Sequence, residues 1–281
     1  MRLTHQLLTV SALSLLTSVA MASNYNFELN GGYSEFETKD KAYDDDSSYG
    51  QAKIYFNGVD VKNHLFAEAA FLERASNISV AYHRTSGVYD DAHIYPGDHD
   101  HIKFVDEASN VNLEFWAFNK FLYVSGGVTD YKSRIRGTYH VGQDHIDARE
   151  NIGPESEWNA AVGISPIAGL VIATDFYEDD DFDDVWTVRS KYVAEWGAGG
   201  INVELGYMNY YKEDIINAAL DFFITRTFSI GGFYSYYEDS LQDDPWGVRA
   251  RQFITPYFSV QGGYDKYDDD DGWNVGVTLR F

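Results

Sequence analysis

Short stretches in which apolar and polar side chains alternate recur along almost the whole chain. The last of them, residues 272–281 (GWNVGVTLRF), has a large apolar residue at every second position from Trp273 to Phe281 and polar or small residues between them. This period of two is that of a β-strand with one apolar and one polar face. Convincing helical periodicity is absent after residue 22. The sequence therefore predicts an all-β protein.

The connections between these stretches alternate between long acidic segments and short turns. The long ones are residues 38–48, 85–109, 141–157, 178–184, 238–245 and 268–271, and the short ones are residues 119–120, 165–169, 197–200, 225–227 and 255–257. Such alternation is typical of an antiparallel up-and-down barrel, in which long loops and tight turns occupy opposite ends. Counting backward from Phe281 predicts about 14 strands, within a range of about 12–16.

One predicted strand, residues 65–84, contains a change of phase. Its apolar residues fall on odd positions up to Phe71 and on even positions from Ile78 onward. We expect a bulge or break near residues 74–77, because one extra residue moves every later side chain to the other face. A true loop at this place would instead raise the strand count to about 16.

The width of the predicted barrel indicates whether the protein is a membrane protein or a soluble protein. A barrel of about 14 strands encloses a space too wide for side chains to fill, so its interior should hold water and its exterior should be apolar. Indole rings favour the membrane interface, and five tryptophans lie near predicted strand ends: Trp158, Trp186, Trp196, Trp246 and Trp273. These features predict a transmembrane β-barrel.

The N-terminus indicates export. Arg2 precedes the apolar run Leu7–Val19, and Ala20–Ala22 (AMA) has the small-x-small form that signal peptidase cleaves. We expect residues 1–22 to be a cleaved signal peptide and residues 23–281 to form the barrel domain. No later run of about 18 apolar residues offers a membrane-spanning helix.

Composition excludes several classes of function. The formal net charge of -23 argues against nucleic acid as a partner, because phosphate contacts need an excess of Lys and Arg. Cysteine is absent, which excludes disulfides, thiolate catalysis and cysteine metal sites. Clusters of loop carboxylates predict a mild preference for cations and offer ligands for divalent ions that bridge to lipopolysaccharide. None matches the spacing of an EF-hand loop, and no protein metal site or cofactor is predicted.

The strand that ends at Phe281 resembles the assembly signal of outer-membrane β-barrels. The whole mature chain resembles a Gram-negative porin, and residues 68–82 (EAAFLERASNISVAY) resemble a segment of a porin family of gamma-proteobacteria. The resemblance implies location in the outer membrane, in contact with lipid and lipopolysaccharide, and insertion by the barrel assembly machinery. It further implies passive diffusion of small hydrophilic solutes, without enzymatic activity. Larger porins of this class are homotrimers.

Charged residues on the strands are candidates for the lining of a pore. A charge that faces hydrocarbon at the bilayer midplane costs about 2–4 kcal/mol, so these residues should face inward. Opposed acidic and basic walls would set a transverse field across a constriction. The alternative is that these residues form compensating pairs in a solvated lumen. The predicted pore-lining residues are Glu28, Lys53, Glu68, Glu114, Asp175, Arg189, Lys191, Glu195, Glu204, Asp221, Arg249, Arg251, Asp265 and Arg280.

Two other functions remain open. A solute-specific channel of the oligosaccharide type is favoured by tyrosines on the polar strand faces, such as Tyr123, which stack well on sugar rings. A barrel hydrolase would need catalytic residues, and the His-x-Ser pattern expected of a barrel phospholipase is absent. Residues 98–101 (DHDH) and 144–145 (DH) provide the Asp and His of a barrel protease, although such acidic loops are more often simply solvated.

Overall fold

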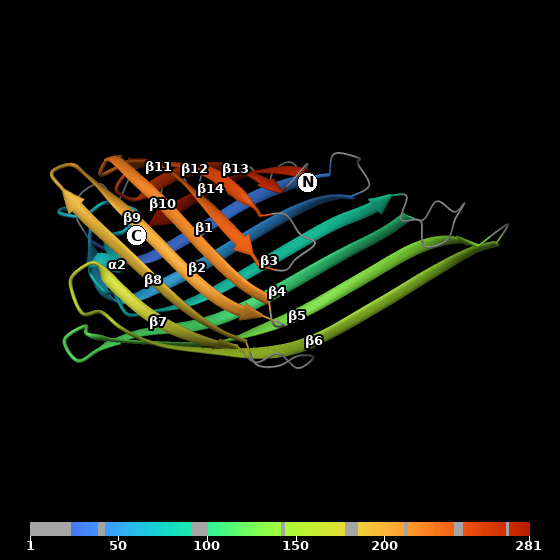
Figure 1. The fold of residues 1–281 in the computed structure, drawn as a ribbon, viewed down its shortest axis with the longest axis horizontal. Helices are drawn as coiled ribbons and strands as arrows, with labels where there is room; N and C mark the ends of the chain where they lie inside the picture. The colour runs from blue at the N-terminus through green and yellow to red at the C-terminus, as the bar shows by residue number, and fades with distance from the viewer. Residues whose placement is uncertain are drawn as a thin grey trace, which may run out of the picture.

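The computed structural model describes residues 24–38, 43–90, 101–141, 144–177, 185–210, 213–238, 244–267 and 270–281. The predicted signal peptide, residues 1–22, lies outside the described residues. The chain forms a closed barrel of 14 antiparallel strands (Figure 1). This confirms the predicted fold class and strand number.

Each strand pairs with its neighbours along the chain, and β1 pairs with β14 to close the barrel. The strands are β1 (Asn24–Glu37), β2 (Tyr43–Asp60), β3 (Asn77–Asp90), β4 (His101–Ala117), β5 (Leu122–Val141), β6 (Asp144–Ile164), β7 (Leu170–Tyr177), β8 (Val185–Trp196), β9 (Gly199–Tyr210), β10 (Glu213–Thr225), β11 (Phe228–Tyr237), β12 (Trp246–Thr255), β13 (Phe258–Tyr267) and β14 (Asp270–Arg280). A short helix, α2 (Ala69–Leu72), lies between β2 and β3.

The last residue of the chain completes the closure. The register between β1 and β14 runs from Glu28 opposite Arg280 to Glu37 opposite Asp271. Beyond this ladder, the Phe281 N–H donates to the Phe27 carbonyl at 2.9 Å, and the two rings lie 5.9 Å apart. Closure satisfies backbone groups that would otherwise form a free sheet edge.

The outer face of the barrel is apolar. Val248, Val275 and Val277 are 51%, 49% and 45% exposed, although such residues are normally buried in a soluble protein. Near the ends of the acidic loops, Trp273 lies 5.6 Å from the ring of Tyr33. All five tryptophans named from the sequence are exposed on this face. An apolar band with interfacial aromatic residues is the surface of a transmembrane barrel.

Among the described residues, no helix is long and apolar enough to cross a membrane.

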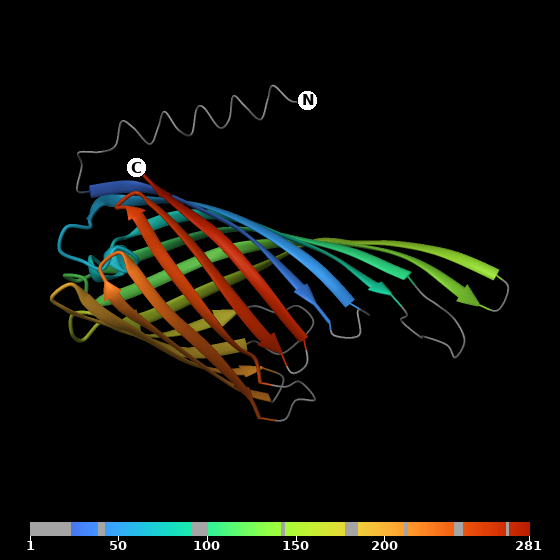
Figure 2. The same cartoon turned by 90° about the horizontal axis from the view of Figure 1, so that it is seen from above.

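The two ends of the barrel differ. The first residue of β1, Phe281 and the short turns lie at one end, here called the turn end. The strand ends that flank the acidic connections lie at the other end, the loop end. Strands β3 to β6 project beyond the others at the loop end (Figure 2). The loops predicted at residues 38–48, 85–109 and 141–157 are therefore largely wrong, because much of each is strand. These projecting segments lack the apolar face that reveals a membrane strand.

The connection between β2 and β3, residues 61–76, is at the turn end and is called the plug below. The strand predicted over residues 65–84 is wrong in its first half, since β3 begins only at Asn77. The predicted break is present, with Arg74 at a φ of 50°. The loop adds no strands, so the count of sixteen is wrong.

Candidate functional site

The plug is held at the turn end by apolar contacts. Leu65 is 1% exposed and belongs to a cluster with Val193 of β8 and Phe223 of β10. The ring of Phe66 packs edge-on against Phe253 of β12, with centroids 5.8 Å apart. Full burial of one such side chain contributes about 1.5–3 kcal/mol. The plug therefore forms part of a small packed core inside the barrel.

Hydrogen bonds attach the plug to several sides of the rim. The Phe66 N–H donates to the Arg226 carbonyl at 2.9 Å, in the turn between β10 and β11. Arg74 donates to the Ile167 carbonyl at 2.8 Å, in the turn between β6 and β7. Lys120, between β4 and β5, donates to the Glu73 carbonyl. Because these turns are distributed around the barrel, the plug crosses the opening.

His64 connects the plug to β8 through two carboxylates. Its Nδ1 lies 2.9 Å from Glu195 Oε2, and its Nε2 lies 3.1 Å from Glu73 Oε1. Glu195 Oε1 also accepts the Leu65 N–H at 2.6 Å. Burial by itself lowers the pKa of His64, but hydrogen bonds and negative charge from Glu195 and Glu73 outweigh it and raise the pKa above its usual value. The protonated imidazole satisfies both carboxylates at once.

This arrangement predicts that the plug is held less firmly at alkaline pH. Neutral histidine has one N–H, so one carboxylate loses its donor. Because the pKa is raised on folding, the stabilisation is complete below about pH 6.5 and disappears as the pH rises through the folded value. The ammonium of Lys120 also faces Glu73, at 3.8 Å. Single-channel recordings should show more frequent openings at about pH 8 than at about pH 6.

The His64→Gln variant is the control for this pH effect. Glutamine retains a side-chain donor but does not titrate. Openings of this variant should be equally frequent at both pH values. A pH dependence as strong as that of the unmodified protein would show that another group is responsible.

Most predicted pore-lining residues on the barrel wall form ion pairs. Arg189 lies 2.8 Å from Asp175, and Arg249 donates two hydrogen bonds of 2.7 Å to Asp221. The remaining pairs, with N–O distances of 2.7–3.0 Å, are Arg280 with Glu28, and Lys191 with both Glu204 and Glu68. The basic and acidic residues of these pairs are therefore interleaved and do not form separate charged walls.

The other predicted residues have different environments. Glu114 accepts a hydrogen bond from Asn77 at 3.0 Å, and Asp265 accepts one from Asn274 at 3.1 Å. Lys53 forms no ion pair among the described residues. Glu68, predicted to lie on a strand, is instead on the plug beside α2, where it reaches Lys191 at 2.8 Å.

Two cavities lie in the interior between the plug and the loop end. One of about 420 Å³ is lined by residues that include Glu68, Arg251 and Gln261, and another of about 360 Å³ includes Asp175 and Arg189. They share the lining residues Lys191, Glu204 and Phe233. Charged and polar side chains make up most of the lining of the 420 Å³ cavity, as expected for a wet interior.

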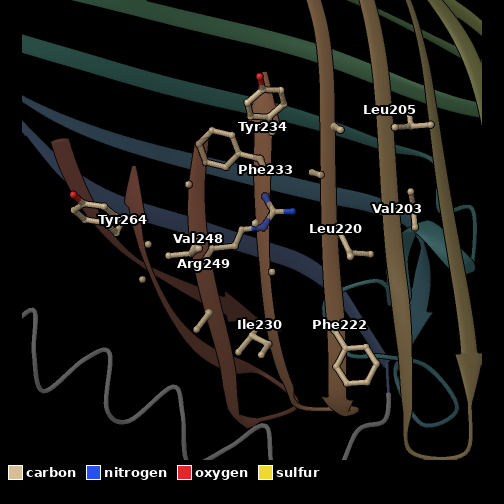
Figure 3. Close-up of a pocket in the computed structure, with 18 residues that line it drawn as sticks. Val203, Leu205, Leu220, Phe222, Ile230, Phe233, Tyr234, Val248, Arg249 and Tyr264 are labelled. Atoms are coloured by element: carbon tan, nitrogen blue, oxygen red, sulfur yellow. The ribbon is translucent and has the colours of Figure 1, made fainter. Parts of the chain in front are cut away.

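A hollow of about 1220 Å³ has a different character. Figure 3 shows its lining residues from strands β9 to β13. Leu205, Leu220 and Val248 belong to the exposed apolar outer face, and small residues such as Gly232 and Gly262 leave a depression between them. This hollow is therefore lipid-facing surface and carries no polar chemistry.

Most Asp and His side chains considered for a barrel hydrolase are not described by the structure. Asp98, His99 and Asp100 lie outside the described residues, as do the side chains of Asp144 and His145. Within the described ranges, no group of three His, Asp or Glu side chains is placed to hold a metal ion. Tyr123, considered for sugar stacking, is buried with the Arg189 guanidinium 5.5 Å above its ring.

The closed antiparallel barrel, the apolar outer belt and the charged interior define a transmembrane β-barrel of porin-like architecture. The chain is similar in structure to the outer membrane protein Omp33 of Acinetobacter baumannii, with a TM-score of 0.65 and 22% identity over 92% of this chain and 99% of that one. A multiple mutant of the Rh. blastica porin aligns over 91% and 99% of the two chains, with a TM-score of only 0.44 and 12% identity. At these identities the likeness to Omp33 establishes a common fold.

Comparison with protein-family models and with curated protein sequences found no match.

Proposed function

We propose that the protein is an outer-membrane channel through which small hydrophilic solutes and ions diffuse. The observation that carries this proposal is the closed barrel with an apolar outer face and charged cavities inside. By the usual arrangement of such barrels, the loop end faces the medium and the turn end faces the periplasm. The charged inner-face residues would line the pathway, and lipid and lipopolysaccharide would surround the belt.

The plug makes this channel a gated one. Hydrogen bonds from the plug to turns around the rim support this proposal, in which the plug restricts the periplasmic opening and solutes pass freely only when it moves. Two roles expected from the resemblance, recognition of Phe281 by the barrel assembly machinery and assembly into a homotrimer, stay predictions. No enzymatic activity is proposed.

A solute-specific channel is the second candidate, and the plug favours it. A barrel that is closed at rest needs a signal to open, and a solute bound in the interior cavity beside Glu68 would provide one. A general diffusion pore has no need of such a cavity.

Ion selectivity provides the test of the channel proposal. Of the predicted pore-lining residues, eight are acidic and six are basic, which favours cations mildly. In planar bilayers with a tenfold KCl gradient, the reversal potential of the open channels should have the sign expected for a cation-selective current. Replacing Glu114 and Asp265 by their amides should move that potential toward the anion side. An anion-selective current, or purified folded protein that never conducts even with the plug shortened, would contradict the proposal.

A further inference from the structure

Arg251 differs from the basic residues around it because no carboxylate of the described residues forms an ion pair with it. Arg249, Arg280 and Lys191 each form an ion pair, whereas Arg251 forms none among the described residues. Its Nε donates to Gln261 Oε1 at 2.9 Å. The four N–H groups of the guanidinium Nη atoms have no acceptor among the described residues. They form an unused planar fork of donors that lines the 420 Å³ cavity.

The position of this fork is fixed by neighbouring strands. Gln261 of β13 also donates to the Tyr49 hydroxyl of β2 at 3.2 Å. Tyr49 lies flat on the inner wall because Gly32 has no side chain, and a Cβ there would come within 2.3 Å of the ring. Arg251 is therefore held by a chain of side chains from β12, β13 and β2. Donors held in place before a ligand arrives bind it with less loss of entropy.

The cavity has the size and lining of a small-molecule site. Its volume of about 420 Å³ lies within the range of about 300–1,000 Å³ that is usual for ligand pockets. Asn202, which is 1% exposed, contributes a buried Oδ1 with no hydrogen-bond partner among the described residues. Around Arg251 the lining includes the carboxylates of Glu204, Asp265 and Glu68.

We propose that this cavity binds a small organic carboxylate that carries hydroxyl or amino groups, with its carboxylate on Arg251. A guanidinium fork matches the two oxygens of a carboxylate in geometry and charge. The acidic residues of the lining accept hydrogen bonds from hydroxyl or amino groups further along the solute. They also repel a doubly charged phosphate more strongly than a singly charged carboxylate.

The same site is coupled to the plug. Glu68 forms its ion pair with Lys191 at 2.8 Å, and both residues line this cavity together with Arg251. A bound carboxylate adds negative charge beside Glu68 and competes with it for Lys191. Binding therefore weakens one attachment of the plug, and by thermodynamic reciprocity an open plug binds the solute more tightly. This coupling rests on the proposed channel function, whereas the binding site does not.

Calorimetry with two probes tests the binding site. Gluconate and sorbitol share a six-carbon polyhydroxyl chain, but only gluconate has a carboxylate. Titration of the purified, folded barrel at constant ionic strength should show binding of gluconate and none of sorbitol. Arg251→Gln should weaken gluconate binding by at least about tenfold, as expected for loss of a charged hydrogen-bonding partner. Arg251→Lys keeps the charge without the fork. Its affinity for gluconate should lie between those of the unmodified protein and Arg251→Gln.

Arg134→Gln is the matched control. Arg134 also lies on a strand and pairs with Glu107 at 2.9 Å, but it does not line the cavity. Gluconate affinity should be unchanged in this variant. Three results would overturn the site: absence of gluconate binding by the unmodified protein, equal binding of sorbitol, or full affinity in Arg251→Gln.

Bilayer recordings separate the site from the channel proposal. Gluconate should raise the open probability above that in equal sorbitol, and Arg251→Gln should abolish the increase. Calorimetric binding of gluconate without this increase would overturn the coupling. A protein that binds gluconate but never conducts, even with a shortened plug, would overturn the channel function and leave the binding site standing.

Discussion

Replacement of residues 63–74 by a short Gly-Ser turn should convert rare openings into a steady current in planar bilayers. Burial of Leu65 and Phe66, together with the hydrogen bonds to the rim, holds the plug across the opening. If these contacts favour the seated plug by only about 3 kcal/mol, the open state is populated at about one part in a hundred. Removal of the plug should then raise the mean current by up to about a hundredfold.

The full-length variant Leu65→Asp provides an independent version of this experiment. It places a charge among Val193 and Phe223, which disfavours the seated plug without shortening the chain. Its mean current should lie between those of the unmodified and shortened proteins. Both variants should remain folded barrels, judged by heat-modifiable migration in gels. A folded, shortened variant that conducts no more than the unmodified protein would show that the plug does not close the pathway.

Arg280→Ala should be strongly destabilising, by about 3–5 kcal/mol. Arg280 is 4% exposed, pairs with Glu28 at 2.7 Å and donates to the Phe66 carbonyl at 2.7 Å. Its guanidinium also lies 4.5 Å from the ring of Tyr25. Alanine would leave the Glu28 carboxylate buried beside the β1–β14 closure without a partner. Urea unfolding of the detergent-solubilised barrel measures the loss.

Two matched variants check this explanation. Arg134→Ala removes a more exposed ion pair with Glu107 and should be much less destabilising. Adding Glu28→Gln to Arg280→Ala removes the unpaired charge and should recover part of the lost stability. Equal destabilisation by Arg280→Ala and Arg134→Ala would contradict the assigned role of the buried pair.

The membrane-spanning part of the fold was predictable because hydrocarbon imposes a simple pattern. In β14, the alternation of Val275 and Val277 with polar residues follows from lipid on one side and water on the other. The projecting part of β6, from Asp144 onward, has water on both sides. No alternation is required there, so the sequence resembles a loop, and only pairing with β5 makes it a strand.

The plug was missed for a different reason. Its apolar residues fit a strand that faces lipid, whereas Leu65 is buried, and Phe71 partly buried, against other parts of the barrel. The run from Ala67 to Arg74 (AEAAFLER) is rich in helix-forming residues, a signal that could have identified α2. The inward orientation of the charged strand residues was predictable, because a charged side chain that faces lipid is energetically unfavourable. Their partners could not be predicted, because the pair between Glu68 and Lys191 depends on how the plug folds back.

The projecting segment of β6 has a consequence for self-association. Residues 144–158 pair with β5, but β7 reaches β6 only from Asn159 onward, so no described strand covers their second side. Exposed backbone of this kind recruits foreign strands and seeds aggregation. Pro154 lacks an N–H, and Glu150 and Glu155 add like charges along the same border. The chain thus extends a two-stranded ribbon into water. The composition of this ribbon opposes the addition of strands from other molecules.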